Sequence, residues 1–112
     1  MSDIIKKMEA EYPKMTKRFK EIQHEQYMLF LKKQHDYGSH NISVGTKLET
    51  DEEVKLSLTG LWFRMHDKIQ RAKNLIMREN NEVDDEPLED SFLDLSNYGI
   101  MSVLVSEKIW GK

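Results

Sequence analysis

The sequence predicts an all-α fold, a helical bundle of three long helices preceded by a short N-terminal helix. The 112 residues include only five Gly and two Pro, so few positions disfavour helix. Apolar residues recur at spacings of three and four over most of the chain. A capping box at Thr50–Glu53 marks one helix start. We expect residues 1–112 to form a single domain, as is usual for this length.

A proline separates the first two predicted helices. Residues 4–12 form a short amphipathic helix, which Pro13 interrupts. The next helix runs up to about Lys33. Residues 35–49 are expected to form a loop, because Gly and polar residues break the helical period there. A loop of this length between two helices is longer than usual, and such loops are often functional.

Two further helices are predicted in the C-terminal half. One begins near Asp51 and ends at Asn80-Asn81. Acidic residues precede Pro87, which suits the first turn of the last helix. Its buried face is expected to comprise Leu88, Phe92, Leu95, Ser102, Val105 and Ile109.

Composition and charge restrict the class of function. The chain has no Cys, which excludes a disulfide framework and thiolate metal sites and favours a cytoplasmic location. The longest apolar run, residues 100–105, is too short to cross a bilayer, and the N-terminus has no signal-peptide pattern. We therefore expect no membrane association. The net charge of −3, with eight Asp/Glu against two Lys/Arg in residues 81–112, argues against nonspecific binding of duplex DNA.

One helical face of the last helix carries an acidic stripe. Glu86, Glu89, Asp90 and Asp94 recur at helical spacings, so their carboxylates can converge. Oxygen ligands of this kind suit Mg²⁺ or Mn²⁺. A solvated helix start is the ordinary alternative. That alternative explains Asp94 poorly, because Asp is a poor helix former and this one lies two turns inside the helix.

The preceding helix carries a basic stripe of Arg64, Lys68 and Arg71, with Asp67 among them. These cations flank the apolar face, where long side chains can reach a phosphate group. The ordinary alternative is that they cover the edge of the core and pair with acids. A third segment, Lys33 to Gly38, resembles a helix end with a Gly cap. In it, Lys33 could contact phosphate and Tyr37 could stack on a base.

Taken together, three patterns resemble the family called nucleotide modification associated domain 1, which is common in bacteriophage genomes. They are Lys33-x-x-Asp36-Tyr37-Gly38, Gly60-Leu61-x-x-Arg64-x-x-Asp67-Lys68-x-x-Arg71 and Glu89-Asp90-x-x-x-Asp94-Leu95-x-Asn97-Tyr98. The resemblance runs from about residue 31 to 109. It implies a small helical protein that binds a nucleotide or nucleoside triphosphate, in host cytoplasm if phage-encoded. The expected nucleotide contacts are Lys33, Asp36, Tyr37, Arg64, Lys68, Arg71, Asn97 and Tyr98.

The family is in turn similar to the MazG-like all-α nucleotide pyrophosphatases. Those enzymes hold Mg²⁺ with an E-x-x-E pair on one helix and an E-x-x-D pair on the next. This resemblance implies a Mg²⁺-dependent hydrolase with Asp90, Asp94 and Asp67 as catalytic residues and Glu86, Glu89, Asp90 and Asp94 as metal ligands. Where the first pair is expected, this sequence reads Arg64-x-x-Asp67, with one acid in place of two. The resemblance also implies a homo-oligomer, because related enzymes build their sites between subunits.

Two other functions remain open at this stage. The chain could bind a nucleotide or nucleotide signal without hydrolysing it, as the missing acid favours. It could instead be a helical interaction or assembly protein, with Trp62, Phe63 and Trp110 as an interface. In that case, Asp90 and Asp94 would simply pair with the basic stripe inside the bundle.

Overall fold

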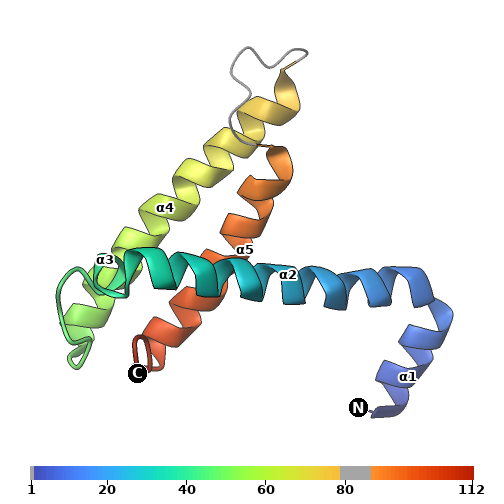
Figure 1. The fold of residues 1–112 in the computed structure, drawn as a ribbon, viewed down its shortest axis with the longest axis horizontal. Helices are drawn as coiled ribbons and strands as arrows, with labels where there is room; N and C mark the ends of the chain where they lie inside the picture. Colours follow the sequence, from blue (N-terminus) through green and yellow to red (C-terminus); the bar gives the residue numbers. More distant parts are fainter. Residues whose placement is uncertain (1, 79–86) are drawn as a thin grey trace.

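The computed structural model describes residues 2–78 and 87–112 and shows an all-α fold, as predicted (Figure 1). The helices are α1 (Ser2–Glu11), α2 (Pro13–Tyr37), α3 (His40–Ser43), α4 (Asp51–Met77) and α5 (Leu88–Ser106). Three of them are long, and the N-terminal one is short. In the described part of the chain, no helix combines the length and apolar character that a membrane span requires.

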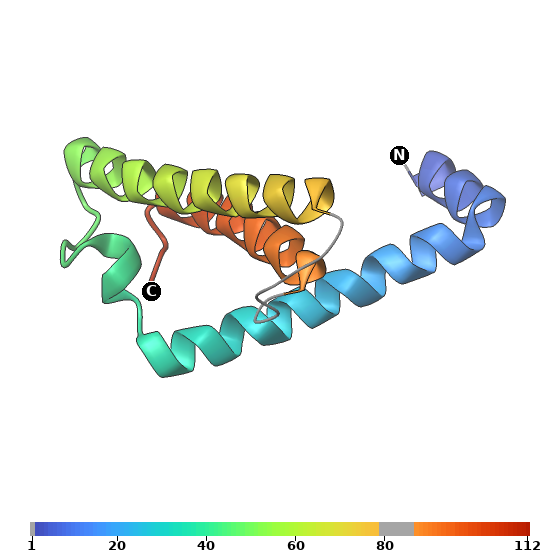
Figure 2. The ribbon, with the colours of Figure 1, turned by 90° about the horizontal axis from the view of Figure 1, so that it is seen from above.

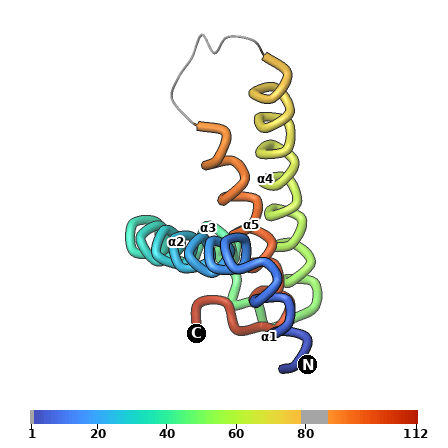
Figure 3. Tube along the Cα trace, turned by 90° about the vertical axis from the view of Figure 1, so that its right-hand side faces the viewer, coloured from blue at the N-terminus to red at the C-terminus, as the bar shows by residue number. Residues whose placement is uncertain are grey.

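The helices form two layers. Helices α4 and α5 lie side by side in one layer, and α2 crosses α5 in the other (Figures 1 and 2). Beyond this crossing, the N-terminal part of α2 runs on past α5, and α1 folds back at its end (Figures 2 and 3). The radius of gyration is therefore 17.0 Å, whereas a compact chain of this length has about 13 Å.

Pro13 separates α1 from α2, as predicted. Proline is compatible with the first turn of a helix but not with its interior, so α2 begins at this residue. The bend is held on its inner side by Lys20, whose Nζ lies 2.6 Å from Glu9 Oε2. Both groups are partly or largely exposed, so this ion pair adds little stability.

Helix α2 ends later than predicted, because it continues one turn beyond Lys33 to Tyr37. Gly38 stops it with φ 73° and ψ −174°, while its N–H donates to the carbonyl of Gln34 at 2.8 Å. The segment predicted as a loop also contains the short helix α3. Ile42 and Leu48 from this segment are buried in the core, so it packs as part of the domain. Ser57 in α4 donates to the carbonyl of Ile42 at 2.7 Å and holds α3 in place.

The predicted start of α4 is confirmed. Thr50 Oγ1 accepts from the N–H of Glu53, and the Glu53 carboxylate accepts from the N–H of Thr50, each at 3.1 Å. The backbone N–H groups of Thr50 and Glu49, which both donate to the Glu53 carboxylate, lower the pKa of Glu53. As far as the structure describes it, α4 ends at Met77. The predicted end at Asn80-Asn81 lies outside the described residues.

The predicted buried face of α5 is wrong in its N-terminal half. Phe92 is 48% exposed, and the buried residues there are the polar Ser91, Asp94 and Asn97. Val105 is buried as predicted and joins Met101 in the core, whereas Ile109 is 48% exposed. The physical reason is that α2 and α4 supply partners for Asp94 and Asn97, which removes most of the penalty of burying these two side chains. Ser91 Oγ has no hydrogen-bond partner among the described residues.

Candidate functional site

A cavity of about 290 Å³ lies where α2, α3, α4 and α5 meet. Most of its charged and polar wall comes from two turns of α2 and two turns of α5. Its lining comprises Phe30, Lys33, Gln34, Tyr37, Asn41, Ile42, Arg64, Lys68, Asp94, Asn97, Tyr98 and Met101. These lining residues come from the C-terminal part of α2, from α3, and from the α4–α5 layer. Figure 1 shows α2 crossing this layer.

Asp94 is the central charged group of this cavity. Its side chain is 9% exposed, and each of its oxygens accepts from a different lysine. Lys33 Nζ of α2 lies 2.8 Å from Oδ1, and Lys68 Nζ of α4 lies 2.9 Å from Oδ2. One carboxylate therefore connects three helices, and the two ammonium groups are held at the cavity wall.

The ion pairs determine the charge state of Asp94. Burial favours the neutral acid, but the hydrogen bonds from Lys33 and Lys68 outweigh it and lower the pKa of Asp94 below its ordinary value. Asp94 is therefore ionised at neutral pH. Its charge stabilises the two lysines in the absence of any ligand.

A second polar contact fixes α2 on α5 beside the charged group. Gln26 Nε2 donates to Asn97 Oδ1, and Asn97 Nδ2 donates to the backbone carbonyl of Gln26, both at 3.2 Å. Ser96 Oγ donates to Gln26 Oε1 at 3.1 Å. Gln26 and Asn97 are 6% and 7% exposed, so their amides depend on each other for hydrogen bonds.

The structure brings together seven of the predicted site residues. Lys33, Tyr37, Arg64, Lys68, Asp94, Asn97 and Tyr98 all line the cavity. They derive from three separate segments of the sequence, so residues of all three patterns line one cavity. Tyr37 lies at the rim of the cavity and is 69% exposed.

The remaining predicted residues are placed elsewhere or are not described. Asp36, Asp67, Arg71, Glu89 and Asp90 are exposed and do not belong to the cavity lining. Asp36 contacts its neighbour His35 at 3.3 Å. Glu86 lies outside the described residues. The acidic stripe is thus divided, with Asp94 inside the cavity and Glu89 and Asp90 on the surface.

The described residues do not fit a divalent cation in this arrangement. No group of three or more His, Asp or Glu in residues 2–78 and 87–112 is placed to hold a metal ion. Asp94, the one carboxylate among the described residues of the cavity lining, already accepts from two lysines. Its pairing with Lys68 is the internal ion pair that the sequence left as an alternative. The Mg²⁺ or Mn²⁺ site of Glu86, Glu89, Asp90 and Asp94 stays a prediction.

Sequence reasoning missed several residues of the site. Five further residues line the cavity: Phe30, Gln34, Asn41, Ile42 and Met101. Gln26 lies outside the lining and donates a hydrogen bond to Asn97. A signal for Gln26 was present, since it interrupts the apolar series of Met15, Phe19, Ile22 and Phe30 at helical spacing. A polar residue in such a series is often buried with a polar partner.

Comparison with known protein families identifies one family. The family described as nucleotide modification associated domain 1 matches residues 33–105. The chain belongs to this family. The match covers every residue of the cavity lining except Phe30, and it leaves out α1 and most of α2. No curated protein and no solved structure matches the chain.

Proposed function

We propose that this chain binds a nucleotide through its phosphate group in the cavity between α2, α4 and α5. The observation that carries the proposal is the charge of the lining. Among the described residues of the lining, Lys33, Arg64 and Lys68 face one carboxylate, Asp94. These four side chains carry a net charge of +2, although the whole chain is acidic. A cluster of this sign attracts anions, and Arg and Lys are the usual phosphate ligands.

The same cavity offers groups for the rest of a nucleotide. The exposed ring of Tyr37 lies at the rim and can stack on a base. The amides of Gln34 and Asn41 can donate to and accept from a base edge or a sugar. The volume of about 290 Å³ is at the lower end of ligand pockets, which span about 300–1,000 Å³. We therefore propose a single nucleotide as the ligand. The family name, which refers to nucleotide modification, supports this class of ligand.

Asp94 acts in this proposal as an internal counter-ion. Each ammonium group has three N–H donors, of which Asp94 takes one from Lys33 and one from Lys68. A phosphate oxygen would therefore share these ammonium groups with Asp94. A negative carboxylate so close to the phosphate also weakens its binding, because like charges repel in a partly buried site.

Mg²⁺-dependent hydrolysis of a nucleoside triphosphate is the second candidate. It is favoured by the similarity of the sequence patterns to MazG-like enzymes and by the position of Asp90 and Glu89 one turn before Asp94 on α5. It requires carboxylates to gather around a cation, so Asp94 would have to release its lysines. The proposed setting under either function is the cytoplasm, where nucleotides are abundant, and the proposed form is a homo-oligomer.

Calorimetric titration with inorganic phosphate and with nucleoside mono-, di- and triphosphates tests the proposal. Each ligand is measured with Mg²⁺ and with a chelator. We expect binding in chelator, and we expect Asp94→Asn to tighten it severalfold, because the repulsion is removed and both lysines are released. Asp90→Asn is the matched control on the same helix and should leave the affinity unchanged.

The outcomes separate the two candidates. Binding that strictly requires Mg²⁺, with turnover that Asp94→Asn and Asp90→Asn both abolish, would establish the hydrolase and overturn simple binding. The absence of binding by any of these ligands at millimolar concentration would overturn both and favour the interaction protein.

A further inference from the structure

The N-terminal part of the chain presents a large apolar surface that its own core does not cover. We call residues 2–22, which comprise α1 and the first part of α2, the arm. Six large apolar side chains of the arm are between 41% and 64% exposed: Ile4, Ile5, Met8, Tyr12, Met15 and Phe19. The arm extends past α5 and away from the core (Figures 1 and 2). Monomeric proteins rarely expose apolar surface of this extent.

The exposed arm continues a face of α2 that is already used for packing. Met15, Phe19 and Ile22 precede Gln26 at helical spacings, which places them within about 40° of it around the helix axis. Phe30 and Lys33 lie on the same face of α2. In the C-terminal half of α2 this face contacts α5 through Gln26–Asn97 and Lys33–Asp94. The N-terminal half has the same apolar pattern, but α5 has already diverged from it (Figure 1).

A groove that could receive such a helix lies between α2 and α5. It is a cavity of about 380 Å³ with mainly apolar walls, to which Tyr27, Phe30, Ile100 and Leu104 contribute. Tyr27 and Ile100 are 55% and 51% exposed. This α2/α5 groove shares Phe30 and Asn97 with the charged cavity but lacks its lysines and arginine. It therefore suits an apolar helix and not a phosphate group.

We propose that a second copy of this chain covers both surfaces, with the arm of each copy seated in the α2/α5 groove of the other. Such an exchange is a two-fold contact in which the same two patches occur on both partners. It goes beyond nucleotide binding and does not depend on it. The arm also lies outside the segment that matches the family, so the proposal concerns a feature of this chain.

The exposed apolar side chains supply a large part of the area that a stable dimer needs. A fully buried aromatic side chain covers about 150–250 Å², so a half-exposed Tyr or Phe offers about 100 Å², and the smaller Ile and Met offer less. The six apolar residues of the arm, with Tyr27 and Ile100 of the groove, thus supply most of the value of about 800 Å² per partner that is typical of specific interfaces.

The charge of the arm favours a protein partner over a membrane surface. Residues 2–25 carry six Lys/Arg and five Asp/Glu, so the polar side of the arm is nearly neutral. Helices that lie on anionic membranes are usually rich in Lys and Arg on that side. Balanced charge is compatible with the same segment of a second copy.

Light scattering coupled to size exclusion, applied to the full chain at tens of micromolar, tests the assembly. We expect a mass twice the 13.3 kDa of one chain. Phe19→Glu should weaken dimerisation at least tenfold, because it places a charge in the apolar contact. His24→Glu is the matched control; it adds the same charge to exposed α2 surface about 160° around the axis from Gln26 and should leave the dimer intact. Circular dichroism verifies that both variants stay helical.

Cross-linking tests the arrangement itself and does not require a destabilising variant. The natural chain has no Cys, so Met15→Cys and Ile100→Cys each introduce a single thiol. When the two variants are mixed and oxidised, a disulfide-linked heterodimer should form in preference to either homodimer.

A monomeric wild type, whether or not it binds anionic vesicles, would overturn the proposal. So would a dimer that Phe19→Glu leaves unchanged, or one in which homodimers are the main disulfide product. Each of these results leaves the test of nucleotide binding unaffected.

Discussion

Gln26 and Asn97 hold the two layers of the fold together by an exchange of hydrogen bonds. The side-chain amide of Gln26 donates to that of Asn97, which in turn donates to the backbone carbonyl of Gln26, each over 3.2 Å. Asn97 lines the charged cavity, while Gln26 lies on its far side in the wall of the α2/α5 groove. The pair therefore determines where α2 crosses α5, and with it the position of Lys33 relative to Asp94.

We predict that Asn97→Ala lowers the free energy of unfolding by about 1–3 kcal/mol, because it leaves the amide of Gln26 buried without this partner. Urea unfolding followed by circular dichroism measures the change. Gln23→Ala, at an exposed position of α2 one turn before Gln26, serves as the control and should change stability by less than about 0.5 kcal/mol. In a double-mutant cycle, Gln26→Ala should add little to Asn97→Ala; additive effects would show that the two amides act independently.

Most of the fold could be predicted from the sequence because helix starts and ends are determined locally. Pro13, the capping box at Thr50–Glu53 and Gly38 each act on neighbouring backbone groups, so local patterns predict the break between α1 and α2, the start of α4 and a Gly cap after α2. The helical apolar period alone, however, places the end of α2 at Lys33, one turn too early. This error arose because the polar residues 34–37 look like a loop, although α2 still uses Gln34 to line the cavity.

The rotation of α5 could not be predicted in the same way. The apolar series of Phe92 and Leu95 suggested one buried face, whereas the structure buries the polar side with Asp94 and Asn97. That choice depends on Lys33, Lys68 and Gln26, which come from distant segments and supply the ion pairs and hydrogen bonds.

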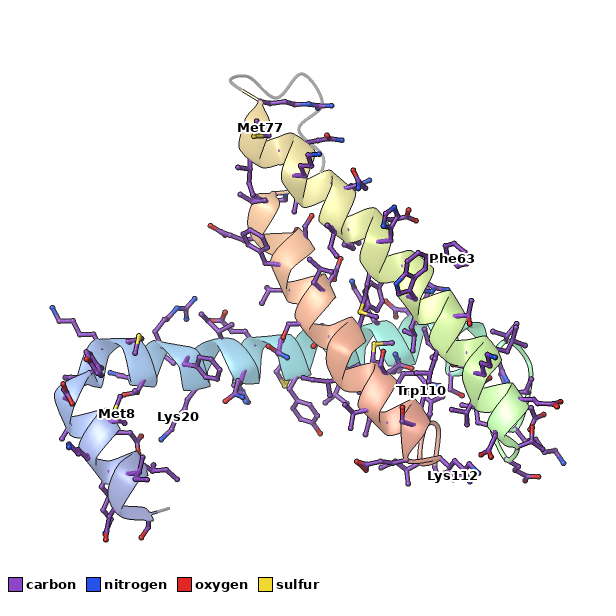
Figure 4. The ribbon with its side chains drawn as sticks, turned by 180° about the vertical axis from the view of Figure 1, so that it is seen from behind. Met8, Lys20, Phe63, Met77, Trp110 and Lys112 are labelled. Carbon is purple, nitrogen blue, oxygen red and sulfur yellow. The ribbon has the colours of Figure 1, made fainter. Side chains whose placement is uncertain are left out.

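The suggested place of Trp110 at an interface is wrong, because a distant segment provides its partner as well. Trp110 is 6% exposed, and its indole N–H donates to the backbone carbonyl of Ser39 at 3.0 Å. Phe63 does point outward from α4 (Figure 4).

The ion pairs of Asp94 predict a stability that depends on pH. Its pKa is lowered in the folded chain, whereas the unfolded chain has the ordinary value of about 3.9. The stabilisation is thus fully present above this value and is lost as the pH falls through the lower, folded pKa. At pH 7, Asp94→Asn should be about 1–3 kcal/mol less stable than the wild type.

The difference between wild type and Asp94→Asn should shrink as the pH is lowered from 5 to 2, because the wild-type carboxylate then loses its charge. Urea unfolding at a series of pH values measures it. Asp90→Asn, an exposed carboxylate earlier in α5, provides the comparison and should differ little from the wild type at pH 7. A difference for Asp94→Asn that stays constant over this range would contradict the role of the charge.

Gly38 is predicted to be required for the end of α2. Its φ of 73° and ψ of −174° lie in a region that is essentially restricted to glycine. A Cβ at this position would meet no atom within 4 Å, so Gly38→Ala tests the backbone conformation without a steric clash. We expect a loss of about 1–3 kcal/mol, measured by thermal or urea unfolding. Gly99→Ala is the control, because Gly99 lies within α5, also has an open surrounding, and should gain stability from the higher helix propensity of Ala.

The two arginines of the basic stripe should differ in their effect on ligand binding. Arg64 lines the cavity, whereas Arg71 lies two turns further along α4 and does not. Removal of a cation that contacts phosphate costs its charge-assisted hydrogen bonds, so Arg64→Ala should weaken phosphate or nucleotide binding about tenfold or more. Arg71→Ala removes the same charge outside the cavity and should change the affinity less than about threefold at 0.15 M salt, where the Debye length is about 8 Å.

Calorimetric titration at two salt concentrations measures the affinity of both variants. Equal losses for the two variants would indicate that the whole stripe binds the ligand, as the sequence pattern alone suggested, and that the cavity is not the site.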